Sequence, residues 1–397
     1  MGLGPGESVK PSWNPLKCRG TGLPVNLTIL VKSLAVVVLL TNHVKILPDP
    51  WLPFIPAIGL IPPVLFQRTL QTVFVLSALA IIFNRRIRLA SLVIGSTMLI
   101  SVVSSKAYYG NNKTFCGLMF FLAGLYQPGG PNFIRWQLAV TYFGAGLNKL
   151  LDVDWQSGIF FENWAVHRLR QPWYIALDSR LPALFLARFF CWTTIATELG
   201  IVPCLFVPRL YYWAALCNVV FQASLLLFTG TTFTLFFYSM SAASLAVINW
   251  PALPLTVLYD PVRGFGNRAR KVFEFWDLDA SFRWIPYLSD EDAKSDLPRV
   301  ASRSGVYLLA GERVYSGFRA LRMMVLLSPI TYFAIAVSIA IAGDLSDWAM
   351  LYRRVIVAAY LALLLPPLAW FADLLSHDVK LQIANIGTNA ADCRRLS

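Results

Sequence analysis

Long apolar runs separated by short polar turns dominate the pattern of the chain. One apolar stretch, residues 51–67, differs from the others because it holds four prolines. Proline removes a backbone donor and so interrupts a continuous helix. We therefore expect an interfacial or re-entrant segment there and about ten transmembrane helices. The ten runs approach the roughly 20 residues that a helix needs to cross a bilayer, and they lie at residues 27–47, 70–84, 88–108, 114–128, 133–150, 183–207, 209–229, 231–249, 324–343 and 353–374.

Mixed, strand-like sequence fills residues 251–323, where the long apolar runs stop. This segment holds 11 Lys or Arg and 9 Asp or Glu, a near-balanced charge typical of a water-soluble fold. Alternating strands and helices followed by a strand pair indicate a small α/β insert of thioredoxin-like shape. The predicted fold class is an all-α polytopic membrane bundle with this insert. Its strands are predicted at 256–259, 282–287, 305–310 and 313–315, and its helices at about 265–277, near 290–297 and from 318.

Composition supports a multi-pass membrane protein, because 57% of the residues are hydrophobic and only 14% are charged. The net charge of +13 would suggest nucleic-acid binding in a soluble protein. In a membrane protein, the distribution of Lys and Arg among the loops instead indicates the orientation in the membrane. We therefore expect no nucleic-acid partner. If the basic clusters lie in the cytoplasm, both termini and residues 251–323 are cytoplasmic, and the 151–182 loop lies on the outer side of a plasma or inner membrane. Arg353 and Arg354 then also lie on the outer side, which counts against this orientation. The clusters comprise Lys10, Lys17, Arg19, Arg85, Arg86 and Arg88.

The scattered cysteines and histidines predict no metal site. None of the six cysteines forms a C-x-x-C pair, and the three histidines are far apart in sequence. The expected partners are membrane lipids and a peptide or protein at the insert. The expected domains are a cytoplasmic tail at 1–25, a transmembrane domain at 26–250, the insert at 251–323, further transmembrane helices at 324–375 and a cytoplasmic tail at 376–397.

Residues 145–155 place a lysine and two carboxylates where an apolar helix ends. Lys149 can simply snorkel to the headgroups, as lysines at helix ends do. In a low-dielectric pocket the same amine would lose its proton more readily and become a base. Asp152 and Asp154 could tune that base, or they could hold the ammonium in a structural ion pair.

Glu198 is the other candidate, because it lies in the middle of an apolar helix. A charge there requires a partner and a position facing the bundle. Arg135, Arg188 and Lys149 are the possible partners, and an ion pair without any chemistry is an equally open interpretation. In the next helix Asn218 and Gln222 lie one turn apart, which interhelical hydrogen bonding explains.

The 151–182 loop combines basic and aromatic residues. Its aromatic residues are typical of interfacial anchors on an amphipathic helix that lies on the membrane. A contact with a headgroup or an acidic substrate is the functional alternative, and we include His167, Arg168 and Arg170 with Arg135 as candidate substrate-binding residues.

Residues 135–158 closely resemble the signature of the HTTM family, the membrane domain shared with vitamin K-dependent γ-glutamyl carboxylase. The resemblance extends over roughly residues 25–250 and includes the pair Asn111 and Asn112 before an apolar helix. It implies a membrane enzyme that acts with a reduced quinone, vitamin K-like, with Lys149 at or one residue from the base. The family pattern has adjacent lysines, whereas Asn148 precedes Lys149, and the large lumenal portion that holds the protein substrate is lacking, so glutamate carboxylation does not follow.

Residues 257–260, 282–286 and 305–321 resemble the DCC-type thiol-disulfide oxidoreductase-like domain, which often follows the helices in HTTM proteins. That family opens with Tyr-Asp-Gly-x-Cys-x-x-Cys, but here Arg263 and Gly266 occupy the two cysteine positions. Without a thiolate there is no thiol-disulfide exchange. The resemblance therefore implies a docking or regulatory domain that is redox-inactive.

Two hypotheses remain open from the sequence. One is a quinone-linked or carboxylase-like enzyme with Lys149 as base, Asp152 and Asp154 as tuning groups and Glu198 as inner partner. The other is a non-enzymatic membrane scaffold or transporter-like protein in which Lys149 and Glu198 are structural. An enzyme needs a lysine that titrates, whereas a scaffold tolerates arginine at position 149.

Overall fold

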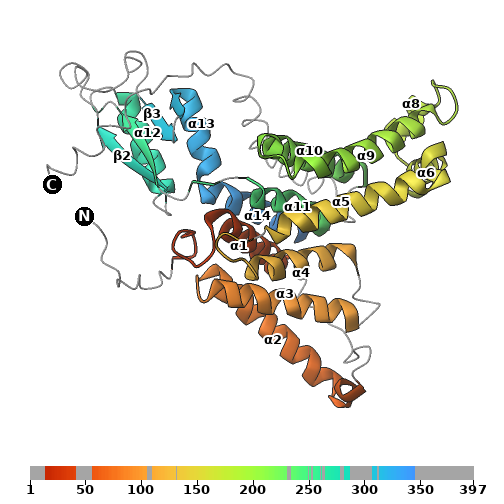
Figure 1. Ribbon diagram of the computed structural model, residues 1–397, viewed down its shortest axis with the longest axis horizontal. Helices are drawn as coiled ribbons and strands as arrows, with labels where there is room; N and C mark the ends of the chain where they lie inside the picture. Colours follow the sequence, from red (N-terminus) through yellow and green to blue (C-terminus); the bar gives the residue numbers. More distant parts are fainter. Residues whose placement is uncertain are drawn as a thin grey trace. The chain divides into compact units, whose positions relative to one another are not determined.

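The computed structural model describes residues 14–41, 56–104, 110–130, 132–229, 234–248, 250–251, 254–259, 261, 264–277, 281–286, 306–310 and 313–344. Within them the chain forms two compact units (Figure 1). The helical unit holds residues 14–15, 20–248 and 333–344, and the sheet unit holds the described residues among 16–19 and 250–332.

The helical unit contains a series of long helices with short helices between some of them (Figure 1). The longer helices are α1 (Val25–Leu40), α2 (Pro63–Ile82), α3 (Ile87–Ser104), α4 (Asn111–Gly124), α5 (Phe133–Leu151), α9 (Phe185–Cys204), α10 (Tyr211–Thr229) and α11 (Thr234–Ala243). The short ones are η1 (Pro56–Leu60), α6 (Val153–Ser157), α7 (Ile159–Glu162), the π-helical turn η2 (Asn163–Arg168), α8 (Pro172–Asp178), η3 (Pro208–Leu210) and η5 (Ser244–Ala246).

Three helices among the described residues, α2, α3 and α9, are long and apolar enough to cross a membrane. A fourth candidate is the bent pair of α13 (Phe318–Leu327) and the first part of α14 (Pro329–Asp344). Helices form at nine of the ten predicted runs, and residues 353–374 lie outside the described part of the chain. Several of these helices are short, such as α4 with 14 residues, so the count of ten spans stays a prediction.

Prolines set two boundaries that differ from the prediction. Helix α2 begins at Pro63 rather than at residue 70, because proline fits the first helical position, where no backbone donor is needed. The predicted run 324–343 divides into α13 and α14, which are bent by 65°. Ser328 between them is extended, with ψ of 122°, because the residue before a proline avoids the helical region.

Helix α1 lies in the core of the helical unit. Twelve of its 16 residues are buried, and a helix that is apolar on all sides belongs in such a position. Helices α3 and α4 pack closely because of glycine. A Cβ on Gly95 would lie only 2.5 Å from the backbone nitrogen of Phe121, so a side chain there would separate the two helices.

The sheet unit contains four strands in the order β2-β1-β3-β4. Val257 of β1 lies opposite Trp284 in the parallel pair with β2 and opposite Leu308 in the antiparallel pair with β3, and Leu308 lies opposite Tyr315 of β4. The strands and helices confirm the sequence pattern to within one residue at most boundaries, while the helix predicted near 290–297 lies outside the described residues. The elements are β1 (Leu255–Tyr259), α12 (Gly264–Trp276), β2 (Phe282–Pro286), β3 (Val306–Ala310), β4 (Arg313–Ser316) and α13.

Candidate functional site

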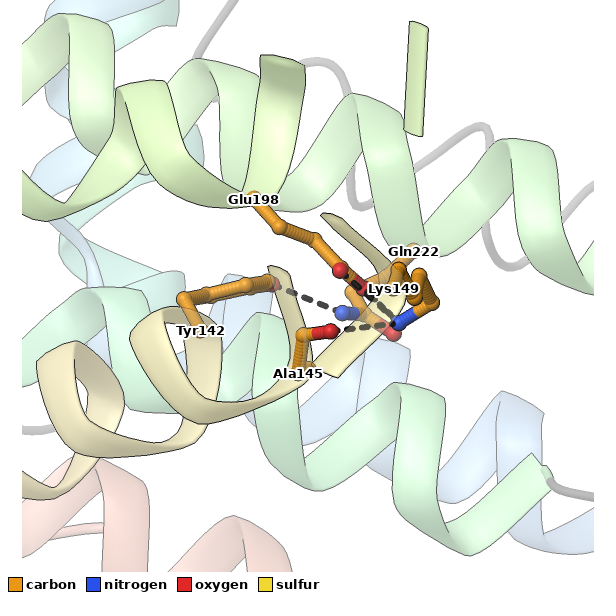
Figure 2. A network of polar contacts seen from close by, with 5 residues as sticks. All are labelled: Tyr142, Ala145, Lys149, Glu198 and Gln222. Carbon is orange, nitrogen blue, oxygen red and sulfur yellow. Dashed lines mark hydrogen bonds and ion pairs between the residues drawn. The ribbon is translucent and has the colours of Figure 1, made fainter. Parts of the chain in front are cut away.

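Lys149 and Glu198 form an ion pair between α5 and α9 (Figure 2). The Lys149 ammonium lies 2.8 Å from each carboxylate oxygen of Glu198. The two side chains are 19% and 7% exposed, so the pair is largely removed from solvent. Since a buried charge is costly unless it is paired, the ion pair explains how both residues are tolerated. Of the three partners that the sequence offered for Glu198, the structure selects Lys149.

A glycine brings the two helices close enough for this contact. Gly146 lies three residues before Lys149 and therefore on nearly the same face of α5. A Cβ at Gly146 would lie 2.8 Å from Leu199 Cδ2 and 3.3 Å from Glu198 Cβ. The absence of a side chain there allows α9 to pack directly against α5 beside the ion pair.

The Lys149 ammonium has two further neighbours. The carbonyl of Ala145 accepts from Nζ at 3.4 Å, and the ring of Trp155 has its centroid 5.1 Å away. An aromatic face attracts a cation within about 6 Å of its centroid. The ammonium therefore contacts a carboxylate, a carbonyl and an aromatic ring.

A chain of hydrogen bonds begins at Tyr142, two turns before Lys149 on α5 (Figure 2). The buried Tyr142 hydroxyl donates to Asn218 Oδ1 and accepts from Gln222 Nε2 at 2.7 Å. Gln222 is 1% exposed, and its Oε1 has no hydrogen-bond partner among the described residues. Figure 2 shows the Gln222 side chain directed toward the same polar region as Lys149 and Glu198. Tyr142 was not among the residues predicted from the sequence, although its spacing from Lys149 places both on one helix face.

Asn218 extends this chain to a third helix. Its Nδ2 donates to the Met240 carbonyl in α11 and to Ser244 Oγ in η5, both at 2.7 Å. These contacts confirm the interhelical hydrogen bonding predicted for Asn218 and Gln222. The amide of Asn218 is thus satisfied by groups on neighbouring helices, as interhelical hydrogen bonding in an apolar bundle requires.

The two aspartates predicted to tune Lys149 lie in the exposed turn after α5. Asp152 accepts a hydrogen bond from the backbone N–H of Asp154 at 2.8 Å and caps the short helix α6. Neither carboxylate pairs with Lys149. The ion-pair partner of Lys149 is Glu198. The Asp152 carboxylate instead caps α6, which is a structural role.

Arg135 lies at the opposite end of α5 from Lys149. Fourteen residues separate them, which corresponds to about 21 Å along a helix. The Arg135 guanidinium donates to the Tyr211 hydroxyl at 2.5 Å and lies 4.3 Å from the centroid of its ring. The structure therefore does not bring Arg135 to the Lys149 site. Arg188 is also engaged elsewhere, since its Nε donates to the Ser157 carbonyl at 2.9 Å.

His167, Arg168 and Arg170 lie on the exposed side of the 151–182 segment. None of their side chains has a hydrogen-bond or ion-pair partner among the described residues. Arg170 has a φ of 48°, in the left-handed region that a non-glycine residue rarely adopts. The His167 imidazole and the two guanidinium groups are available to solvent and are not part of the Lys149 cluster.

The aromatic residues of the same segment form a buried cluster around Phe161 and Phe228. These two rings lie 4.8 Å apart between centroids. The Tyr174 hydroxyl donates to Glu162 Oε2 at 2.6 Å. Burial is the main cause that raises the pKa of Tyr174 above its ordinary value, and the hydrogen bond to Glu162 is the second. The predicted interfacial anchors are therefore partly packed inward, while Trp173 remains 47% exposed.

A second buried lysine, Lys32, was missed by sequence reasoning. It lies within the apolar helix α1 and is 2% exposed, and its Nζ donates to the Pro15 carbonyl at 2.5 Å. The available signal was the one used for Glu198, an ionisable residue in an otherwise apolar helix.

Among the described residues, no group of three or more His, Cys, Asp or Glu side chains could hold a metal ion. No protein-family model, curated protein or solved structure matches the chain. The case for a function therefore depends on the chemistry of the residues that the structure brings together.

Proposed function

We propose that this chain is an integral membrane protein whose helical unit carries a proton-accepting site for a lipid-soluble, quinone-like molecule, with Lys149 as the base. The observation that carries the proposal is the ion pair of Lys149 and Glu198, 2.8 Å apart and largely buried among apolar helices. An ionisable residue within an apolar bundle is costly, and it commonly marks a functional site. The resemblance of residues 135–158 to the HTTM family supports the same assignment.

Proton transfer within the pair would generate the base. The ammonium of Lys149 passes one proton to Glu198, which leaves a neutral amine beside a neutral carboxylic acid. The amine then takes a proton from the hydroxyl of a bound quinol and becomes an ammonium again, while the quinol becomes its anion. A low-dielectric site helps because it reduces the advantage that water gives to the fully charged pair.

Access from the membrane supports the same proposal. The side chain of Lys149 keeps 19% of its surface exposed. The residues directly after Lys149 include exposed apolar side chains, with Leu151 70% and Val153 72% exposed. A lipid-soluble molecule could therefore approach the amine past the apolar residues at the end of α5, without entering from water.

A structural ion pair is the second candidate, and one observation favours it. The Lys149 ammonium contacts Glu198, the Ala145 carbonyl and the Trp155 ring, which are groups that attract a cation. In this alternative the protein is a non-enzymatic membrane scaffold or transporter-like protein. Its sheet unit is then a redox-inactive docking domain.

The sheet unit fits a degenerate DCC-like domain of thioredoxin-like fold. Its parallel pair β1–β2, joined through α12, and its antiparallel pair β3–β4 are the arrangement expected of that fold. Gly266 occupies one of the two cysteine positions, and the other, Arg263, lies outside the described residues. We assign this unit a peptide or protein partner rather than thiol chemistry.

The proposed orientation places both termini in the cytoplasm, in a multi-pass arrangement. A hydrogen bond supports placing the N-terminal segment and the arginine-rich turn on one side, because Asn84 Nδ2 donates to the Asn14 carbonyl at 2.9 Å. The excess of Lys and Arg in both segments favours the cytoplasmic side.

Binding of a naphthoquinol to the purified protein tests the enzyme hypothesis. Oxidised and reduced naphthoquinone are titrated anaerobically from mildly acidic to alkaline pH, and the absorbance of the quinol anion is recorded. Wild type is expected to bind both forms and to generate the anion at a lower pH than free quinol does. Lys149→Arg keeps the charge but cannot act as base, so binding should persist and anion formation should be lost. Lys271→Arg on the exposed face of α12 is the matched control.

Two outcomes would reject the enzyme hypothesis. If wild type binds neither form, no quinone site exists. If Lys149→Arg generates the anion as wild type does, the lysine is not the base and the structural ion pair is the better assignment.

A further inference from the structure

The positive charge of the chain is concentrated in its first part. Residues 1–151 contain 13 Lys or Arg and only 2 Asp or Glu. Between Asp49 and Asp152 there is no acidic residue at all, although eight Lys or Arg lie there. Most of these cations therefore have no carboxylate of their own segment to pair with, and their counter-charge must come from elsewhere in the protein or from its surroundings.

A cavity of about 590 Å³ lies between α2 and α3, at the turn that joins them. Its walls are mostly apolar and include Leu76, Ala80, Leu89 and Val93, while Arg85 and Arg86 line it at the turn. The volume is within the range of small-molecule sites, about 300 to 1,000 Å³. The lining residues give the cavity a basic end at the turn and an apolar body between the helices. Both helices are long and apolar enough to cross a membrane.

The turn itself has an unusual backbone. Asn84 has a φ of 59° and Arg86 a φ of 43°, both in the left-handed region. Asparagine adopts this conformation readily, but arginine does so rarely. Arg86 and the nearby Arg88 are exposed, and their side chains have no hydrogen-bond or ion-pair partner among the described residues. A strained residue with an unpaired charge at the mouth of a cavity is typical of a ligand site rather than of a simple connection.

We propose that this cavity binds an anionic phospholipid from the surrounding leaflet. Arg85 and Arg86 bind the headgroup phosphate, and an acyl chain lies along Leu76, Ala80 and Val93. Guanidinium groups bind phosphate in bidentate fashion, and basic pockets between transmembrane helices accept anionic headgroups. The apolar walls favour a membrane lipid over a free phosphate, which would leave them exposed to water. This site is separate from the Lys149 cluster and does not depend on the function proposed for it.

Lipid retention measured by native mass spectrometry tests the proposal. The purified protein is exchanged into detergent micelles that contain equal amounts of phosphatidylglycerol and phosphatidylcholine of the same acyl chains. Wild type is expected to retain phosphatidylglycerol preferentially. Arg85→Gln with Arg86→Gln should reduce that preference about 25-fold, because each arginine near an anionic group contributes about fivefold. The matched control is Arg68→Gln with Arg209→Gln, which removes two exposed charges elsewhere and should keep the preference.

A second variant tests the cavity without removing any charge. Ala80→Phe fills the apolar part and leaves every arginine in place, so insertion and orientation are unaffected by charge. It should lower phosphatidylglycerol retention while the thermal midpoint shows that the protein remains folded. Equal retention of the two lipids by wild type would overturn the proposal. So would equal competition by soluble glycerol phosphate, or undiminished retention in a folded Ala80→Phe variant.

Discussion

Two ion pairs of nearly equal length occupy very different surroundings. Lys149 and Glu198 join two helices at 2.8 Å with side chains that are 19% and 7% exposed. Arg270 and Glu274 lie one turn apart on α12 at 2.7 Å with side chains that are 39% and 43% exposed. The attraction between two charges, and the cost of leaving one of them alone, both rise as water is removed. The surroundings rather than the distance therefore decide what each pair contributes.

The exposed pair is a local contact of one helix and its nearest strand. Arg270 also donates to the Tyr259 hydroxyl. The hydrogen bond to Glu274 is the main cause that raises the pKa of Arg270 above its ordinary value, and the hydrogen bond to Tyr259 is the second. Arginine is already fully protonated at physiological pH, so this shift changes neither its charge nor the pH dependence of stability.

The largest expected effect comes from removing one member of the buried pair. Glu198→Leu leaves the Lys149 ammonium buried without its carboxylate and should lower the free energy of unfolding by about 3–5 kcal/mol. The double variant Lys149→Met with Glu198→Leu removes both charges and should recover most of that loss. Unfolding by SDS in mild detergent measures both. A single variant as stable as the double would show that the pair is effectively solvated.

Next in size is the loss of the hydroxyl beside the buried pair. Tyr142→Phe leaves Asn218 Oδ1 and Gln222 Nε2 without their shared partner and should cost about 1–3 kcal/mol. Tyr126→Phe is the control, since that hydroxyl has no hydrogen-bond partner among the described residues. The same unfolding measurement applies, and equal stability of the two variants would contradict the hydrogen-bond chain.

A smaller effect is expected from the glycine that brings α5 and α9 together. Gly146→Ala places a methyl group 2.8 Å from Leu199 Cδ2, and the flexible leucine can move aside, so the cost should be about 1 kcal/mol. Gly144→Ala has nothing within 4 Å of the new Cβ and should stabilise the helix by about 0.5–1 kcal/mol. If both variants shift the midpoint in the same direction, the packing of Gly146 does not limit the approach of the helices.

The smallest effect is expected at the exposed pair. Arg270→Gln removes one charge from a solvated helix surface, where an ion pair contributes little. Its thermal midpoint should equal that of wild type within replicate scatter at physiological salt. A clear destabilisation would mean that the contact with Tyr259 anchors α12 on the sheet more firmly than exposure suggests.

Much of the helical pattern could be predicted from the sequence, because apolar runs and prolines act locally. The starts of α3 and α5 and the strands of the sheet unit follow the pattern closely. The early start of α2 and the division of α13 from α14 were missed, since a proline can either break a helix or begin one. Residues 63–67, predicted as part of an interfacial or re-entrant segment, instead form the start of α2, and residues 51–55 lie outside the described part.

The partner of Glu198 could be predicted only as one of three. Helix arithmetic narrows the choice in retrospect. Arg188 lies ten residues earlier on the same helix, about 15 Å along its axis, so it cannot reach Glu198. Arg135 lies at the other end of α5. What the sequence could not supply is which helices are neighbours, and this also hid the hydrogen bonds of Tyr142, because its partners are 76 and 80 residues away.

The sequence separation of Lys149 and Glu198 also determines how early during synthesis their ion pair can form. Their 49-residue interval means that the ribosome makes α5 well before the carboxylate exists. At about 5–20 residues per second, the lysine waits several seconds without its counter-charge. During that interval α5 can remain at the water interface, where its ammonium is solvated. The ion pair can form only after α9 has been made, so we expect the end of α5 to pack into the bundle no earlier than that.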